Sequence, residues 1–437
     1  MADRIFRLHR RELLAGLGAA TLGPAMPRFA SAQGHPRLTL QARAAEITLR
    51  PGQPGTSIWA LQGSPPDPAL RFKRGDELEI AFQNDLPVAT VLSWRGLEGT
   101  PGTEPLTTRP PVSPGGKENL SMALRRAGTF LCDLRLLGDG QARPLPARPL
   151  IVPESDSPAV DREQVFLIED WRLRPDGSPI APGLDPGDAP TVYTVNGQMT
   201  LDIPARTHER IRFRIINGCQ RAVIALKIQN HEVRVMALDS EPAEPFPARN
   251  SAMVLAPGGR ADAFVDVSAS SSILLHDGQE ARPIGRLIVA NDEPPLRDAA
   301  LPTARPLPAN DVRSQIELKG ALRIDMTFGR PQPEWVTPVR FVNSAAPAFR
   351  AKAGRTVVLA LANRGDIPVV FHLHGHHFRL LDRLDDGWKP FWLDTLAIDS
   401  GQTQRIAFAA EHSGPWLMET MATDWAAPRF VRWYSIE

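Results

Sequence analysis

The stretch RGDELEIAFQNDLP (residues 74–87) alternates apolar and polar residues and then stops at an asparagine. The same plan occurs in HERIRFRIINGCQ (208–220) and in AGRTVVLALANRGDIP (353–368). Alternation with a period of two, ended by a turn that contains Asn, is typical of a β-strand with one buried face. The apolar residues and closing asparagines are Leu78, Ile80, Phe82 and Asn84; Ile211, Phe213, Ile215 and Asn217; and Val357, Leu359, Leu361 and Asn363. The asparagines are 133 (217 − 84) and 146 (363 − 217) residues apart, which is the length of a domain.

A glycine turn that leads into another alternating strand follows each of these stretches. The three turns are SPGGKENLSMAL (113–124), APGGRADAFVDV (256–267) and DSGQTQRIAFAA (399–410). Two features that recur three times in the same order indicate an internal triplication. Proline-rich runs at 151–164 and 292–311 are typical of linkers. We therefore expect an all-β chain of three tandem β-sandwiches, at 36–155, 160–300 and 312–437.

The first 32 residues have the pattern of an export signal. The pair Arg10-Arg11 precedes an apolar run from Leu13 to Met26, and the run Ala30-Ser31-Ala32 resembles a cleavage site. This pattern predicts a twin-arginine signal peptide that is cut after Ala32, and hence a periplasmic protein. The alternative is an ordinary N-terminal helix.

Charge and composition exclude two classes of partner. Residues 1–32 carry five arginines and two acidic residues, so without them the formal net charge falls from +1 to −2. This balance gives no reason to expect nucleic-acid binding, and no later apolar run is long enough to span a membrane. The 43 prolines and 33 glycines fit a loop-rich β protein, and the two cysteines, Cys132 and Cys219, allow at most one disulfide.

Four further stretches carry a resemblance to a known family. They are VLSWRGLEG (91–99), AGTFLCDLRLL (127–137), FHLHGHHF (371–378) and SGPWLMETMATDW (413–425). In order and spacing they resemble the four copper-ligand motifs of the multicopper oxidases, which include laccases, bilirubin oxidases and copper-efflux oxidases. The resemblance spans nearly all of the chain after residue 32. It implies three tandem cupredoxin-like Greek-key β-sandwich domains.

The ligand positions of these motifs are mostly occupied by other residue types. Where the family has its His-x-His pairs in the first two motifs, this chain has Ser93, Arg95, Asp133 and Arg135. The third motif keeps His372 and His374 but has Val369 in place of its first histidine. In the fourth motif the positions of the ligands hold Glu419, Thr420, Met421 and Trp425.

These replacements predict the loss of oxidase chemistry. A blue-copper site needs a thiolate and two imidazoles, and the resemblance places Thr420, Val369 and Trp425 there. We expect Val369 and Trp425 to pack as an apolar plug. Of the eight histidines of the family's trinuclear centre, two are kept. The expected function is therefore that of a non-catalytic accessory module with a periplasmic protein partner, similar to the copper-free, division-associated members of the family.

The charged replacements suggest how the former site is filled. Buried charges are tolerated when they are paired, and Arg can bind a carboxylate through two nitrogens. We therefore expect Arg95 and Arg135 to pair with Asp133 and Glu419. The alternative is that these side chains reach solvent through the family's access channels.

His372 and His374 allow two interpretations. In the first they are core residues, hydrogen-bonded to a carboxylate or to the backbone, and no cofactor is expected. In the second they join Glu419 or Asp133 in a two-His, one-carboxylate site for a single copper or other divalent metal, and the chain is a metal-dependent oxidoreductase. The nearby arginines argue against a bound cation.

Overall fold

The computed structural model describes residues 35–50, 52–64, 69–156, 158–310, 316–330, 332–382, 387 and 389–437. The predicted export signal lies outside these residues. The prediction of an all-β chain is confirmed: the described residues form strands in six sheets, with four short 3-10 helices and no α-helix. No helix in this part of the chain is both long and apolar enough to cross a membrane.

The first two sheets contain the strands between residues 37 and 152. One sheet has the order β2 (Thr56–Ser64), β1 (Arg37–Ile47), β4 (Glu77–Asn84), β6 (Lys117–Ala123). The other has the order β3 (Leu70–Arg71), β8 (Arg148–Val152), β7 (Gly128–Asp133), β5 (Ser93–Arg95). Their apolar side chains meet in one core, which includes Leu40, Ile80, Phe82, Phe130 and Leu150.

The middle pair of sheets contains the strands between residues 162 and 289. One sheet has the order β10 (Pro179–Ile180), β9 (Arg162–Leu173), β13 (Arg210–Asn217), β18 (Arg260–Asp266), β15 (Arg234–Leu238), β16 (Glu241–Pro247), and β11 (Thr191–Val195) also pairs with β9. The other has the order β12 (Leu201–Ala205), β20 (Ala281–Val289), β19 (Ser271–His276), β14 (Ile224–Ile228), β17 (Ala252–Leu255).

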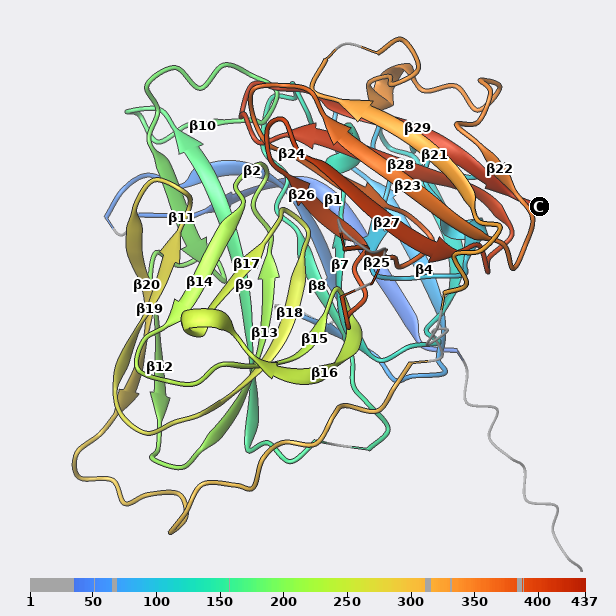
Figure 1. Cartoon of the computed structure of the whole chain (residues 1–437). Coiled ribbons are helices and arrows are strands. Elements are labelled where there is room, and N and C mark those ends of the chain that lie inside the picture. The colour runs from blue at the N-terminus through green and yellow to red at the C-terminus, as the bar shows by residue number, and fades with distance from the viewer. Residues whose placement is uncertain are drawn as a thin grey trace, which may run out of the picture. The chain divides into compact units, whose positions relative to one another are not determined.

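The last pair of sheets contains the strands between residues 322 and 436. One sheet has the order β21 (Leu322–Phe328), β23 (Thr356–Asn363), β27 (Thr403–Ala409), β25 (Arg379–Leu380). The other has the order β22 (Arg350–Ala351), β29 (Arg429–Ile436), β28 (Gly414–Ala422), β24 (Val369–Leu373), β26 (Thr395–Ile398). In Figure 1 the strands β24, β28 and β29 run side by side in the orange and red part of the ribbon.

The three alternating stretches found in the sequence occupy the same place in each pair of sheets. They form β4, β13 and β23, and each lies parallel to the first strand of its sandwich and antiparallel to the strand after the glycine turn. The four 3-10 helices lie in the connections between strands, and each is a single turn. They are η1 (Pro101–Thr103), η2 (Arg135–Leu137), η3 (Arg249–Ser251) and η4 (Pro338–Arg340).

The asparagine that ends each stretch has a structural role. Asn84, Asn217 and Asn363 are fully buried, and the side-chain amide of each donates to two backbone carbonyls. For Asn363 these are the carbonyls of Ile367, at 2.8 Å, and Ile398, at 3.0 Å. Because buried backbone groups need partners, the amide closes the turn that ends the strand.

Candidate functional site

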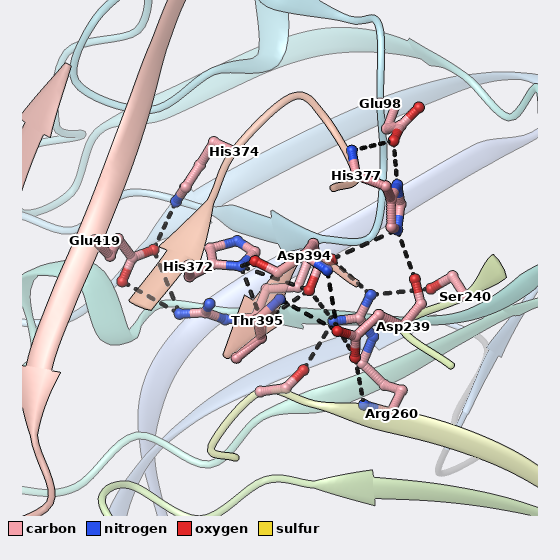
Figure 2. A network of polar contacts seen from close by, with 12 residues as sticks. Glu98, Asp239, Ser240, Arg260, His372, His374, His377, Asp394, Thr395 and Glu419 are labelled. Carbon is pink, nitrogen blue, oxygen red and sulfur yellow. Dashed lines mark hydrogen bonds and ion pairs between the residues drawn. The ribbon is translucent and has the colours of Figure 1, made fainter. Parts of the chain in front are cut away.

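Strand pairing brings His372, His374 and Glu419 together. His372 lies in β24 directly opposite Glu419 of β28, and His374 follows two residues later on the same side of the chain. One ring nitrogen of each histidine and one oxygen of Glu419 lie within 4.8 Å of one another, and all three residues are buried. Figure 2 shows His374 directed at Glu419. The structure thus assembles the two histidines with Glu419, whereas Asp133 is not part of this group.

His374 lies between two carboxylates. Its Nε2 atom is 2.7 Å from an oxygen of Glu419, and its Nδ1 atom is 2.8 Å from an oxygen of Glu104. Burial lowers the pKa of His374, but Glu104 and Glu419 outweigh burial and raise this pKa to about 9. The imidazole is therefore protonated at neutral pH and donates from both nitrogens, so neither nitrogen offers a lone pair to a metal.

His372, in contrast to His374, has a neutral ring. Its Nδ1 atom is 3.0 Å from the carbonyl oxygen of Asp394 and 3.0 Å from the hydroxyl of Thr395. Burial, with the charge of Arg95 as the second cause, lowers the pKa of His372 to about 3. The ring is therefore neutral, and because a carbonyl only accepts, its proton is on Nδ1. The Nε2 atom is then a free acceptor, buried and without a partner among the described residues.

Glu419 is held by two arginines as well as by His374. Nη2 of Arg95 lies 3.2 and 3.3 Å from its two oxygens, and Nη1 of Arg429 makes a close contact with Oε2. Burial raises the pKa of Glu419, but Arg95 and then Arg429 outweigh it and hold this pKa well below its usual range. The group formed by Arg95, Arg429, His374, Glu419 and Glu104, called here the Glu419 cluster, is buried throughout.

Arg95 meets Glu419 as the sequence predicts, but the prediction for Arg135 is wrong. Nη2 of Arg135 lies 3.1 Å from Glu169, and its Nε donates to the carbonyl of Leu145 at 2.8 Å. Among the described residues, the Asp133 carboxylate accepts a hydrogen bond only from the backbone nitrogen of Arg135, at 3.0 Å.

The error has a geometric cause. Asp133 ends β7 and Arg135 begins η2, so the two residues do not share one face of a strand. Ser93 and Arg95, by contrast, both belong to β5. The interpretation that the charged side chains reach solvent is also wrong, because Arg95, Asp133, Arg135 and Glu419 are all at most 5% exposed.

Three participants were not found from the sequence: Glu104, Glu169 and Arg429. Glu104 lies five residues after the first copper-ligand motif and Glu169 lies 32 residues after the second, and no local pattern marks either of them. Arg429 carries a usable signal, because β28 and β29 form a hairpin in which it pairs with Met421, two residues from Glu419 on the same face.

A second buried polar group lies beside the first. His377 makes a close contact with Glu98 through Nδ1 and donates from Nε2 to the carbonyl of Asp239, at 2.6 Å (Figure 2). Arg260 binds both oxygens of Asp394, at 2.7 and 2.9 Å. These residues come from the first, second and third pairs of sheets, so the group, called here the His377 network, joins all three. No pattern in the sequence singles out His377 as a functional residue.

The positions compared with a blue-copper site are divided between two places. Val369 and Thr420 line a cavity of about 650 Å³, which Met421, at another ligand position of the fourth motif, also lines. Trp425 is buried elsewhere, with its ring nitrogen donating to the carbonyl of Ala181 at 3.1 Å. The expected plug of Val369 and Trp425 is therefore wrong. Met421 also accepts a contact from Arg221, at 3.7 Å from its sulfur.

Models of one family, described as multicopper oxidase, match three parts of the chain: residues 43–132, 162–273 and 315–434. The three matches follow the three pairs of sheets. The chain belongs to the multicopper oxidase family. Its sheets form the three cupredoxin-like domains of that fold.

Relatives in this family are distant. Multicopper oxidase MmcO of Mycobacterium tuberculosis is 24% identical, over 92% of this chain and 88% of that protein. Cell division protein FtsP of Pectobacterium atrosepticum is 23% identical, over 64% of each chain. A multi-copper oxidase from Pseudomonas thermotolerans has a similar structure, with a TM-score of 0.78, 24% identity, and coverage of 92% of this chain and 99% of that one.

The family implies copper, and the donor set of the Glu419 cluster does not fit it. A guanidinium has no lone pair for a metal, and Arg95 and Arg429 occupy Glu419. His374 uses both nitrogens on carboxylates. The Nε2 atom of His372 is the one imidazole nitrogen left without a partner among the described residues at these positions. The two cysteines are buried and free, and the Cys219 sulfur lies 3.8 Å from the Ile168 carbonyl.

Proposed function

We propose that this protein is a multicopper-oxidase-family member without the blue-copper and dioxygen-reducing centres, and that it acts as a non-catalytic module that binds a protein partner in the periplasm. One observation carries the proposal: Glu419 is bound by Arg95, Arg429 and His374, where the family resemblance places copper. The cluster fills the position with permanent positive charge.

Electrostatics supports the absence of copper. Arginine stays protonated in proteins, and Arg95 and Arg429 are at most 5% exposed. Charges that are buried are screened far less than charges in water. A copper ion would have to displace two arginines from Glu419 and take one of the two ring protons from His374. Each displaced cation would lose its buried partner, and an unpaired buried charge is costly.

Two observations support the accessory role: the Glu419 cluster does not fit copper, and the chain is similar to a protein of that kind. FtsP, to which the chain is similar, has a name that assigns it to cell division. The proposed export signal at residues 1–32 would bring this chain to the periplasm. We therefore propose a periplasmic protein as the partner, and neither nucleic acid nor membrane insertion.

Copper loading tests the proposal. The purified protein is incubated with cupric and then cuprous ion, desalted, and analysed for bound metal, visible absorption and dioxygen consumption with phenols. We expect less than stoichiometric copper, no intense absorption in the red, and no dioxygen uptake. MmcO, treated in parallel, is the positive control for loading. Stoichiometric copper together with phenol-dependent dioxygen consumption would refute the proposal.

A second candidate is a single-metal site at His372, His374 and Glu419. The unpartnered Nε2 atom of His372 favours it, because a buried polar atom without a partner is rare. Titration with zinc alone, followed by calorimetry, separates the two candidates. One equivalent bound by the wild type and none by His372→Ala would favour the metal site, since His372 contributes no charge to the arginine pairs.

A further inference from the structure

One feature that the Glu419 cluster leaves unexplained is a cavity of about 650 Å³ in the last sandwich. Its wall contains apolar and aromatic side chains from the end of β21, from the turn after β23, and from β24, β28 and β29. The buried part includes Phe328, Trp335, Val369, Thr420 and Met421, each at most 7% exposed. Its volume lies within the range of about 300 to 1,000 Å³ that is typical of small-molecule sites.

The cavity is built from fixed parts. The rings of Phe328 and Trp335 meet edge to face, with centroids 5.4 Å apart. Gly329 has a φ of +78°, and its backbone lies so close to Gly365 that a Cβ atom at residue 329 would come within 2.3 Å of the Gly365 nitrogen. A side chain at position 329 would therefore push the walls apart. The pocket is preformed.

One polar atom is available inside it. Thr420 lines the cavity, and its hydroxyl has no hydrogen-bond partner among the described residues. The residue is 7% exposed, and its hydroxyl is not one of the buried side-chain atoms that lack both a partner and access to solvent. The hydroxyl is therefore accessible from the cavity and is free to donate to a partner there. An acceptor on a bound molecule would provide one.

The mouth carries balanced charge. Arg330 and Asp366 line the cavity on its exposed side, together with Ile367, which is 41% exposed. One cation and one anion give no net preference for a charged ligand, and the buried wall holds no charged residue. The chemistry of the wall therefore favours an uncharged ligand.

We infer that this cavity binds an uncharged, apolar ring compound whose carbonyl or ether oxygen accepts a hydrogen bond from Thr420. This site is separate from the Glu419 cluster and does not depend on the absence of copper. We expect the ligand to be a small molecule, because the available hydroxyl of Thr420 lies on the buried wall of the cavity rather than at the protein surface.

Nile red, an uncharged aromatic dye with a carbonyl group, is the probe for this site. We expect saturable binding of one equivalent to the purified protein, with a blue shift of its emission. Thr420→Val keeps the shape of the side chain and removes the donor, so it should weaken binding about three- to tenfold. Ile367→Trp fills the mouth and should abolish saturable binding. Val254→Trp, at a residue 70% exposed in the second sandwich, is the matched control and should bind as the wild type does.

Each outcome decides a part of the inference. Non-saturable binding, or equal binding by the wild type and Ile367→Trp, would overturn the site. Loss in Ile367→Trp with unchanged affinity in Thr420→Val would overturn the hydrogen bond to Thr420. Equal melting temperatures of the variants establish that they fold. A failure here leaves the copper-loading result unaffected, so the two proposals can fail separately.

Discussion

Removing the charge of Glu419 should destabilise the protein more than removing either arginine. In Glu419→Gln, the three cations Arg95, Arg429 and His374 lose their shared carboxylate while remaining almost completely buried. Breaking a buried ion pair by removing one partner costs about 3–5 kcal/mol. We expect a loss near the upper end for Glu419→Gln. Arg95→Met should lose about 3 kcal/mol, because Arg429 and His374 still neutralise the carboxylate.

Urea unfolding, followed by tryptophan fluorescence and far-UV circular dichroism, measures these losses. If Arg95 acts through Glu419, the double variant will lose less than the sum of the single variants, by at least about 1 kcal/mol. Arg135→Met is the matched control: it is equally buried but pairs with Glu169. Its effect should add to that of Glu419→Gln within about 0.5 kcal/mol. A loss below about 1 kcal/mol for Glu419→Gln, as expected for a solvent-exposed pair, would refute the buried-cluster interpretation.

Three further predictions concern other parts of the molecule. Burial lowers the pKa of His377, but Glu98 outweighs burial and raises this pKa to about 9. Protonated His377 therefore stabilises the fold fully below pH 6.5, and this stabilisation is lost as the pH rises through 9. Unfolding free energies measured from pH 6 to pH 10 should fall by up to about 3 kcal/mol from this group, and His377→Gln should remove that part of the slope. Asn363→Ala leaves the carbonyls of Ile367 and Ile398 without their amide donor. Because Ile398 is fully buried, the change should lower the unfolding free energy by about 1–3 kcal/mol, and an unchanged value would contradict the role assigned to the asparagine. Treatment with a strong chelator should leave the melting temperature of the wild type unchanged, whereas a fall on chelation, reversed by zinc or copper, would point to the single-metal site.

The fold could be predicted from the sequence because it depends on patterns that survive substitution. The alternating stretches and their asparagines are local, and each copy supports the interpretation of the others. The closing asparagine is identifiable because its role, donating to two backbone carbonyls at the turn that it closes, is the same in each copy. The pairing of Arg95 with Glu419 was also predictable, since both lie in strands whose partners the family resemblance supplies.

The rest of the site depends on information that residue types do not carry. Whether Arg135 faces Asp133 depends on where β7 ends, and a strand boundary is uncertain by one or two residues. Glu104, which caps the end of η1, contacts His374 of the third sandwich. Glu169 contacts Arg135 from another domain. Such contacts follow from the packing of one domain on another, which no short motif encodes. The cavity beside Thr420 was missed for the same reason: the sequence shows a missing ligand, not the space that remains.

The charged replacements also act together as a connection between domains. Arg95 and Glu104 come from the first sandwich, and Glu419, Arg429 and His374 come from the third. Two of the ion pairs, Arg95–Glu419 and His374–Glu104, therefore cross a domain boundary. The His377 network adds the second sandwich through Asp239 and Arg260. A metal centre shared by two domains holds them together through its ligands, and a cluster of paired charges can do the same without a metal. Any single charge left alone would be buried without a partner. The members of the cluster therefore stabilise the domain interface only when all of them are present. This dependence explains how paired charges can hold the first and third sandwiches together without a metal.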